Sequence, residues 1–257
     1  MLRDLTAGAA EDAAARQQLV SFDDIEQRAH EQTPALDALA FLAPAERVKI
    51  IAEVKRSSPS RGALATITDP AALASTYQSA GASTVSVLTE GRKFKGSLED
   101  LELVRDAVSI PVLRKDFITL DYQVFEARAA GADLVLLIVA ALEQPELVHL
   151  HELITSLGMT ALVETHSADE VERALDLGAS LIGVNARNLS TFELDQDLFG
   201  RLADRIPAGI IRVAESAVKT AADVSHYRSS GADVVLVGEA LVTGDPARTL
   251  EEFLGIS

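Results

Sequence analysis

Hydrophobic and polar positions follow two alternating patterns along most of the chain. From about Val48 onward, short runs of apolar, often β-branched residues alternate with longer amphipathic segments. The short runs predict buried strands, and the longer segments predict helices. The predicted strands are 48–54, 84–89, 112–115, 134–139, 160–163, 181–185, 210–214 and 234–237. The predicted helices are 70–79, 98–107, 122–130, 145–157, 168–177, 197–205, 221–229 and 246–254.

Residues that typically begin or end helices stand at these boundaries. Side chains able to cap a helix stand before several predicted helices, at Asp69, Ser97, Asp121 and Thr220. Glycines typical of helix carboxyl ends precede five strands, at Gly81, Gly131, Gly158, Gly178 and Gly231. Eight strand–helix units in this length predict an α/β fold, a (β/α)8 TIM barrel. A doubly wound sheet is the alternative, but no Gly-x-Gly-x-x-Gly follows the first strand.

The first 46 residues have a different composition. They are rich in Ala, Asp, Glu and Gln, with a helix cap expected at Ser21 and a helix start expected near Pro34. We interpret residues 1–46 as a helical N-terminal extension and residues 1–257 as a single barrel domain.

Composition narrows the classes of function. The 257 residues are 48% hydrophobic, enough for a sizeable core, and carry 23 basic against 39 acidic residues, a formal charge of −16. This charge disfavours nucleic acid or an anionic membrane as partner. The absence of cysteine excludes disulfides and thiol nucleophiles. The longest apolar run, 134–142, is too short to span a bilayer, and no secretory signal is visible, so we expect a cytoplasmic protein.

Charged side chains gather where the predicted strands end, which is where barrel enzymes carry their active sites. Side chains alternate faces along a strand, so Glu53 and Lys55 share one face, and Lys115 and Phe117 share another. An inward lysine is costly unless it is paired or reaches water. The same counting adds Glu164, Asn185, Arg187 and Glu215. Their convergence predicts paired charges with shifted pKa values, as in a catalytic pocket.

Two further features indicate an anionic, aromatic ligand. The last two strands end in Ala214-Glu215-Ser216-Ala217 and Val237-Gly238-Glu239-Ala240, where barrels commonly bind phosphate. Ser58-Pro59-Ser60 either forms a turn or lines the same site, and Phe94 is a candidate for stacking. The histidines lack the spacing of metal ligands: His149 and His151 point in different directions on one helix, and His166 has no partner at ligand spacing.

Motifs in order along the chain resemble those of the indole-3-glycerol-phosphate synthase family. They are Glu53-Val54-Lys55-Arg56-x-Ser58-Pro59-Ser60, Ser86-Val87-Leu88-Thr89-Glu90, Phe94-x-Gly96-Ser97, Leu113-Arg114-Lys115-Asp116-Phe117, Leu162-Val163-Glu164, Gly183-Val184-Asn185-Ala186-Arg187-Asn188-Leu189 and Ala214-Glu215-Ser216. The resemblance implies a carboxy-lyase of tryptophan biosynthesis, with no cofactor or metal. Its reaction would be ring closure, decarboxylation and dehydration of 1-(2-carboxyphenylamino)-1-deoxyribulose 5-phosphate.

The resemblance also implies roles for individual residues. Lys115 resembles the family's acid and Glu164 its base; Lys55, tuned by Glu53, would hold anionic groups or act as a second acid. Which lysine serves which step stays open. Asn185, Arg187 and Glu215 would position the hydroxyls and the carboxylate. The phosphate side would comprise Ser58, Ser216, Ala217, Gly238 and Glu239, and the anthranilate pocket Phe94 and Phe117.

The chain departs from the family pattern at Ala217, where the family usually has glycine. Since the catalytic set is complete, we expect an ordinary backbone conformation at Ala217. Two alternative functions remain. A phosphate-binding isomerase of the same pathway would use a cysteine base, which is absent, and a non-catalytic phosphate-metabolite-binding barrel would be expected to lack Lys115, Glu164 or Lys55. Association with other tryptophan-pathway enzymes cannot be read from the sequence.

Overall fold

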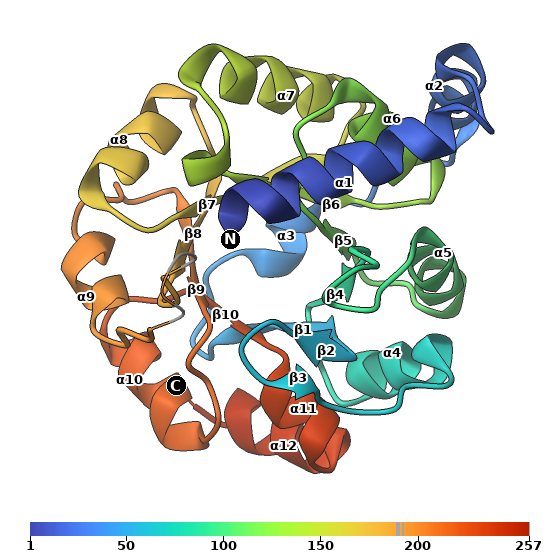
Figure 1. Cartoon of the computed structure of the whole chain (residues 1–257). Helices are drawn as coiled ribbons and strands as arrows, with labels where there is room; N and C mark the ends of the chain where they lie inside the picture. The colour runs from blue at the N-terminus through green and yellow to red at the C-terminus, as the bar shows by residue number, and fades with distance from the viewer. Residues whose placement is uncertain (189–190, 192, 257) are drawn as a thin grey trace.

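Eight parallel strands close into a barrel surrounded by helices (Figure 1). The computed structural model describes residues 1–188, 191 and 193–256. The barrel strands are β1 (Lys49–Val54), β4 (Thr84–Leu88), β5 (Val112–Lys115), β6 (Leu134–Ile138), β7 (Thr160–Thr165), β8 (Leu181–Asn185), β9 (Ile211–Glu215) and β10 (Val234–Val237). β1 pairs in parallel with both β4 and β10, which closes the sheet. The (β/α)8 architecture and all eight predicted strands are confirmed.

The predicted outer helices are also confirmed. They are α4 (Pro70–Ser79), α5 (Leu98–Ala107), α6 (Asp121–Ala129), α7 (Gln144–Ser156), α8 (Ala168–Asp176), α9 (Leu198–Ala203), α10 (Ala221–Ser229) and α12 (Pro246–Leu254). Asp69, Ser97 and Thr220 cap their helices as expected. The cap predicted at Asp121 is wrong, because Gln123 Oε1 accepts the Leu120 N–H and the helix begins one residue earlier, at Asp121 itself.

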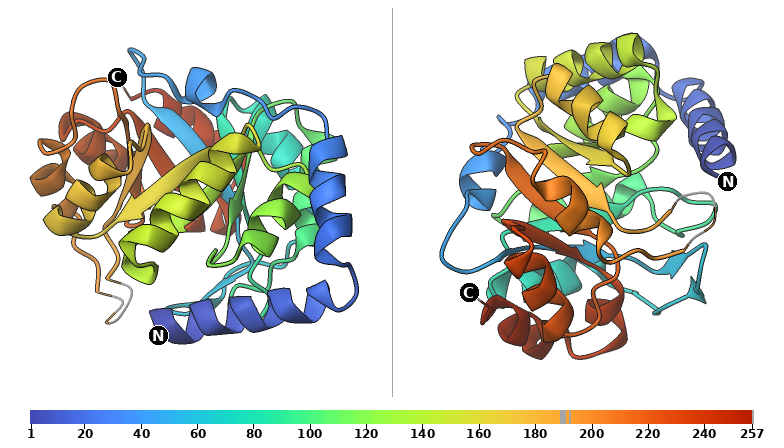
Figure 2. Two further views of the ribbon diagram at one scale, coloured as in Figure 1. Left: turned by 90° about the horizontal axis from the view of Figure 1, so that it is seen from above. Right: turned by 90° about the vertical axis from the view of Figure 1, so that its left-hand side faces the viewer.

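Three helices form the N-terminal extension: α1 (Leu2–Gln17), α2 (Phe22–Glu31) and α3 (Ala38–Leu42). α1 lies across one end of the barrel and α3 lies at the opposite end, while α2 packs beside α6 (Figures 1 and 2). Ser21 caps α2 as predicted. The helix start near Pro34 is wrong: Asp37 caps α3.

The backbone between α2 and α3 is instead bonded to the barrel. The Leu36 N–H donates to Asp133, and Arg128 donates to the Thr33 carbonyl. These bonds hold residues 33–36 outside a helix. The assignment of all 257 residues to one domain stays a prediction.

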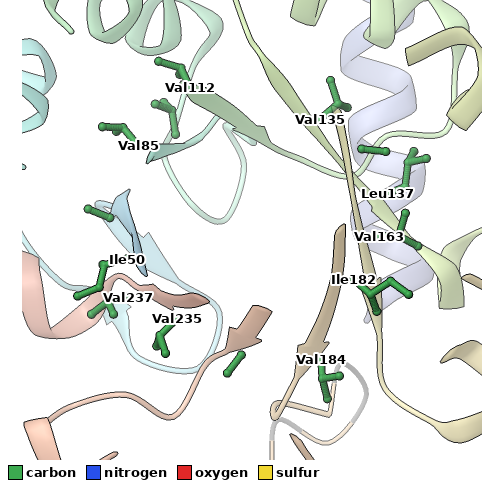
Figure 3. Packing of buried hydrophobic residues seen from close by; sticks show 14 of the residues in the cluster. Ile50, Val85, Val112, Val135, Leu137, Val163, Ile182, Val184, Val235 and Val237 are labelled. Carbon is green, nitrogen blue, oxygen red and sulfur yellow. The ribbon is translucent and has the colours of Figure 1, made fainter. Parts of the chain in front are cut away.

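Two apolar layers follow from the alternation of side chains along each strand. Outward residues such as Ile50, Val85 and Val235 pack between the strands and the outer helices (Figure 3). Inward residues such as Leu113 and Leu162 fill the barrel, joined by side chains of α1 and α3. Toward the carboxyl ends of β1, β5, β7, β8 and β9, the inward positions are polar instead and line a cavity at the barrel mouth.

Four short elements were not predicted. They are β2 (Ser57–Ser58), β3 (Gly62–Ala63), the 3-10 turn η1 (Val139–Ala141) and α11 (Glu239–Thr243). β2 and β3 form an antiparallel hairpin directly after β1. The hairpin and α11 both lie at the strand carboxyl ends, where loops carry function in this fold. Within the described residues, no helix is long and apolar enough to cross a bilayer.

Candidate active site

A cavity opens at the carboxyl ends of the barrel strands, and every site residue predicted from the sequence lines it. The predicted residues brought together there are Glu53, Lys55, Ser58, Phe94, Lys115, Phe117, Glu164, Asn185, Arg187, Glu215, Ser216, Ala217, Gly238 and Glu239. Most come from strand ends that are far apart in the sequence. The closed barrel therefore assembles the site that strand periodicity predicted. Leu189, the last residue of one family-like motif, lies outside the described residues.

Two glycines make room for carboxylates in this cavity. A Cβ at Gly183 would lie 2.1 Å from Glu215 Oε1, and a Cβ at Gly238 would lie 2.5 Å from Glu53 Oε1. Both distances are far below van der Waals contact. Any larger residue at either position would push a buried carboxylate out of place.

Lys115 stands between two buried carboxylates. Its Nζ lies 3.8 Å from Glu164 Oε2 and 3.6 Å from Glu215 Oε2, and both glutamates are almost fully buried. Burial alone would lower the pKa of Lys115, but the charges of Glu215 and Glu164 outweigh it and raise the pKa. Lys115 is therefore a cation in the free protein and can donate a proton.

The two glutamates are pushed toward opposite protonation states. Burial favours a raised pKa in both. In Glu164, contact with His166 and the charge of Lys115 outweigh burial and lower the pKa. In Glu215, burial and the neighbouring Glu164 charge outweigh Lys115 and raise the pKa. With such a split, the ionised carboxylate is able to accept a proton and the neutral carboxyl group is able to give one up.

A second lysine–glutamate pair lies on β1 and just beyond it. Lys55 Nζ lies 2.6 Å from Glu53 Oε1, and Glu53 is almost fully buried whereas Lys55 is partly exposed. Burial alone would raise the pKa of Glu53, but the charges of Lys55 and Lys115 outweigh it and lower the pKa. Glu53 is therefore an ionised anchor that holds the Lys55 ammonium at the cavity wall.

The opposite wall, at the ends of β8 and β9, is polar and tightly turned. Asn185 Oδ1 accepts hydrogen bonds from Ser216 Oγ at 2.8 Å and from the Arg187 N–H at 3.0 Å. Ser216 and Ala217 both have left-handed backbones, with φ of 69° and 57°. The Tyr227 hydroxyl holds this turn by donating to the Ser216 carbonyl at 3.2 Å.

The expectation of an ordinary backbone at Ala217 is therefore wrong. A non-glycine residue with positive φ is strained by about 1–2 kcal/mol. The strain is imposed by the turn between β9 and α10, which seats Ser216 against Asn185 and Tyr227.

Two phenylalanines form the aromatic part of the cavity. The rings of Phe94 and Phe117 lie with centroids 6.1 Å apart at an interplanar angle of 41°. Glu90 fixes the loop that carries Phe94, because its carboxylate accepts the backbone N–H groups of residues 92, 93 and 94. The site therefore places a flat apolar surface across from its polar turn.

Several cavity residues were missed by the sequence reasoning. They include Leu5 from α1 and the exposed Lys219. No strand pattern predicts Leu5, because α1 reaches the barrel mouth from outside the repeat. Lys219 could have been found as the basic residue two positions after the Ala217 turn. Ser58, left open as a turn or site residue, lies in the hairpin and lines the cavity.

One histidine takes part in contacts beside the cavity. His166, for which the sequence suggested no partner at metal-ligand spacing, lies 3.3 Å from Glu164 Oε1 through Nε2 and 3.1 Å from Glu170 Oε2 through Nδ1. The signal that was available is the i, i+4 spacing of His166 and Glu170. Across the described part of the chain, no three His, Asp or Glu side chains are grouped to hold a metal ion.

Comparison with known proteins places these features in a family. The model of the family described as "Indole-3-glycerol phosphate synthase" matches residues 2–253. Proteins of that name are 68% identical in Leifsonia xyli subsp. xyli, covering 100% of this chain and 98% of the relative, and 57% identical in Kineococcus radiotolerans, covering 99% and 94%.

A solved structure shares the fold at much lower similarity. Thiamine phosphate pyrophosphorylase from Pyrococcus furiosus superposes with a TM-score of 0.60 at 14% identity, covering 80% of this chain and 93% of that protein. At this identity the likeness supports the barrel architecture alone.

Proposed function

The chain belongs to the indole-3-glycerol phosphate synthase family, and from that premise we propose how its own residues carry out the reaction. The substrate is 1-(2-carboxyphenylamino)-1-deoxyribulose 5-phosphate. Ring closure joins the carboxylated aromatic carbon to the ketone carbon, after which carbon dioxide and water leave to give indole-3-glycerol phosphate. The observation that carries the proposal is Lys115 held between Glu164 and Glu215 at the mouth of the barrel.

Lys115 is the general acid for ring closure. As the aromatic carbon attacks, negative charge develops on the ketone oxygen, and a cation that can give up a proton stabilises that charge. Lys115 meets both needs, because the negative charge of the ionised Glu164 keeps it protonated and its contacts to Glu164 and Glu215, at 3.8 and 3.6 Å, are loose enough to exchange for a substrate oxygen.

Glu164 is the base for dehydration. Loss of water requires one proton to be taken from the ring-closed intermediate and one to be given to the departing hydroxyl, for which Lys55 is the candidate acid. The lowered pKa of Glu164 keeps its carboxylate free to accept the first proton. Glu215, whose pKa is raised, carries a proton beside it and positions the substrate hydroxyls together with Asn185 and Arg187.

The remaining cavity residues bind the two ends of the substrate, the anthranilate ring and the phosphate. Phe94 and Phe117 hold the anthranilate ring, and Lys55 holds an anionic group and is the second candidate acid. The phosphate binds at the turns after β9 and β10, which supply Ser216, Ala217, Gly238 and Glu239, with Ser58 from the hairpin opposite. No cofactor or metal takes part in any of these steps.

Location and partners follow from the substrate. A doubly charged phosphate ester does not cross a bilayer unaided, so we place the enzyme in the cytoplasm with the rest of tryptophan biosynthesis. Its partner is the small phosphorylated substrate. Any physical association with other enzymes of the pathway is outside this proposal.

Turnover of the substrate by purified protein tests the reaction. We expect indole fluorescence to appear with wild-type protein, and Glu164→Gln to lower kcat more than it changes KM, because the amide keeps the shape but cannot accept a proton. If wild-type protein binds the substrate without forming indole, the chain is a non-catalytic metabolite-binding barrel. If KM alone rises in Glu164→Gln, Glu164 is a binding residue and Glu53 becomes the first candidate base.

The phosphate position has its own test. Inorganic phosphate should compete with substrate, and a crystal soaked in phosphate should show the anion at the backbone N–H groups after β9 and β10. An anion bound at any other place in the cavity would contradict this orientation of the substrate.

A further inference from the structure

His166 contacts Glu164 but is not one of the residues that line the cavity. It follows the end of β7 and is largely buried. Its Nε2 faces Glu164 Oε1 at 3.3 Å as an ion pair, and within the described residues neither atom makes an aligned hydrogen bond. The imidazole therefore contacts the proposed base without lining the cavity.

Glu170, in the first turn of α8, fixes the imidazole ring. Its Oε2 accepts the His166 backbone N–H at 2.8 Å and lies 3.1 Å from Nδ1. Glu170 is held in turn by the cap of α8, where Ser167 Oγ accepts the Glu170 N–H at 3.2 Å. The ring is thus oriented by a helix terminus, and both of its nitrogens face carboxylates.

A ring between two carboxylates is stabilised as a cation. Burial alone would lower the pKa of His166, but its contacts with Glu164 and Glu170 outweigh burial and raise the pKa to about 10. His166 is therefore a cation at neutral pH, and its charge faces Glu164 Oε1.

The two oxygens of Glu164 face different cations. Oε1 faces His166, and Oε2 faces Lys115 from β5. The other titratable groups near the Glu164 carboxylate are Glu215 from β9 and Glu53 from β1, which are acids. When Lys115 turns to the substrate ketone, His166 is the cation that stays with Glu164.

We propose that His166 is a positioning residue for the base: with Glu170 behind it, the imidazolium holds Glu164 ionised and keeps Oε2 directed at the substrate. The inference rests on the proposed role of Glu164 and adds a residue that never contacts the substrate. Removing the cation should misplace the carboxylate and make it easier to protonate.

The test compares His166→Ala and His166→Gln with wild type in kcat, KM and the pH dependence of kcat/KM. We expect His166→Ala to lower kcat about 10- to 100-fold, part of the 10²–10⁴ that acid–base catalysis supplies, with KM changed less than about threefold. The acidic limb of kcat/KM should move up by roughly 1–3 pH units, because an opposite charge at this range lowers a carboxyl pKa by that amount.

His166→Gln separates orientation from charge. Its amide can still donate to Glu164, so kcat should recover in part, while the acidic limb should stay displaced because no positive charge is restored. His149→Ala, on the exposed face of α7, is the matched control and should behave as wild type. A melting curve for each variant identifies any loss of folding, and His166→Gln carries the test where His166→Ala is unfolded.

The outcomes separate this inference from the proposed function. Wild-type kcat and an unmoved acidic limb in folded His166→Ala or His166→Gln would overturn the role of His166, even if Glu164→Gln is inactive. An active Glu164→Gln would overturn the base assignment itself. In the double variant His166→Ala/Glu164→Gln, we expect no loss beyond that of Glu164→Gln alone, since both changes remove one function.

Discussion

Arg114 and Lys115 are consecutive on β5, yet they point to opposite sides of the barrel wall and meet very different surroundings. Each cation faces two buried carboxylates. Arg114 Nη2 lies 3.1 Å from Asp116, Arg114 Nη1 lies 3.4 Å from Glu126, and its guanidinium also donates to the Gln123 carbonyl at 2.7 Å. Lys115 has only its contacts at 3.6 and 3.8 Å, and both Glu215 oxygens lack a geometrically aligned hydrogen bond within the described residues.

We interpret Arg114 as a structural charge and Lys115 as the proposed catalytic charge. Arg114 is 1% exposed and fully engaged, and Glu126 passes the network on to Arg16 of α1, so this side ties the extension to the barrel. Lys115 is 15% exposed at an open cavity, where loose contacts leave the proton free to move. Short, hydrogen-bonded ion pairs such as those of Arg114 stabilise the fold, whereas longer contacts such as those of Lys115 leave the cation able to bind a substrate.

The largest effect on activity is expected from substitution of Lys115. Lys115→Ala should lower kcat by about 10²–10⁴ while leaving the protein folded, because general acid catalysis is worth that much. Steady-state kinetics measures the loss of kcat, and a thermal melt shows whether the variant is folded. Lys49→Ala, at the other end of β1, is the control and should keep its activity. A folded Lys115→Ala with near-normal kcat would remove Lys115 from the acid role.

Substitution of Arg114 should instead lower the free energy of unfolding. Arg114→Met leaves Asp116 buried without a cation and Glu126 with Arg16 alone, and removing one partner of such a buried network typically costs about 3–5 kcal/mol. Urea unfolding measures the loss, and kcat of the folded protein should stay within a few-fold of wild type. Arg114→Lys should also be destabilised, because an ammonium cannot reproduce the forked hydrogen bonds. A stable Arg114→Met would show that the network does not hold the barrel wall.

Glu215→Gln should change how the unfolding free energy depends on pH. Burial and Glu164 raise the pKa of Glu215, so the folded protein holds a proton that the unfolded chain has lost above the ordinary value of 4.5. The unfolding free energy of the wild type therefore falls as pH rises from 4.5 to the raised pKa of about 8. Glu215→Gln stays neutral, and its unfolding free energy should exceed that of wild type by at least about 1 kcal/mol at pH 9, with no gain at pH 4. An equal difference at both pH values would contradict the raised pKa.

The smallest effect is expected at Ala217. Glycine tolerates the left-handed backbone found there, so Ala217→Gly should raise the unfolding free energy by up to about 1 kcal/mol. KM should change less than about threefold, which corresponds to under about 0.7 kcal/mol. Ala214→Gly, inside β9, is the matched control and should lose stability. A tenfold fall in KM for Ala217→Gly would mean that the alanine methyl crowds the phosphate.

Strand periodicity predicted most of this molecule because inward and outward positions alternate strictly. That alternation alone assigns Glu53, Lys115 and Glu164 to inward positions at the strand ends, and all three line the cavity. Features that depend on contacts between distant segments could not be predicted in this way. The turn at Ala217 is held by Tyr227 from α10, and α3 begins late because Asp133 and Arg128 bind the preceding backbone.

The unfolding free energy of Lys115→Met, measured by urea beside Arg114→Met at pH 7, tests the central claim most directly. Losing Lys115 leaves Glu164 paired with His166, and Glu215 can stay protonated. We therefore predict that Lys115→Met loses less than about 1 kcal/mol, against about 3–5 kcal/mol for Arg114→Met. Equal losses would contradict the account, because they would show that Lys115 is held as tightly as Arg114 and serves the same structural purpose.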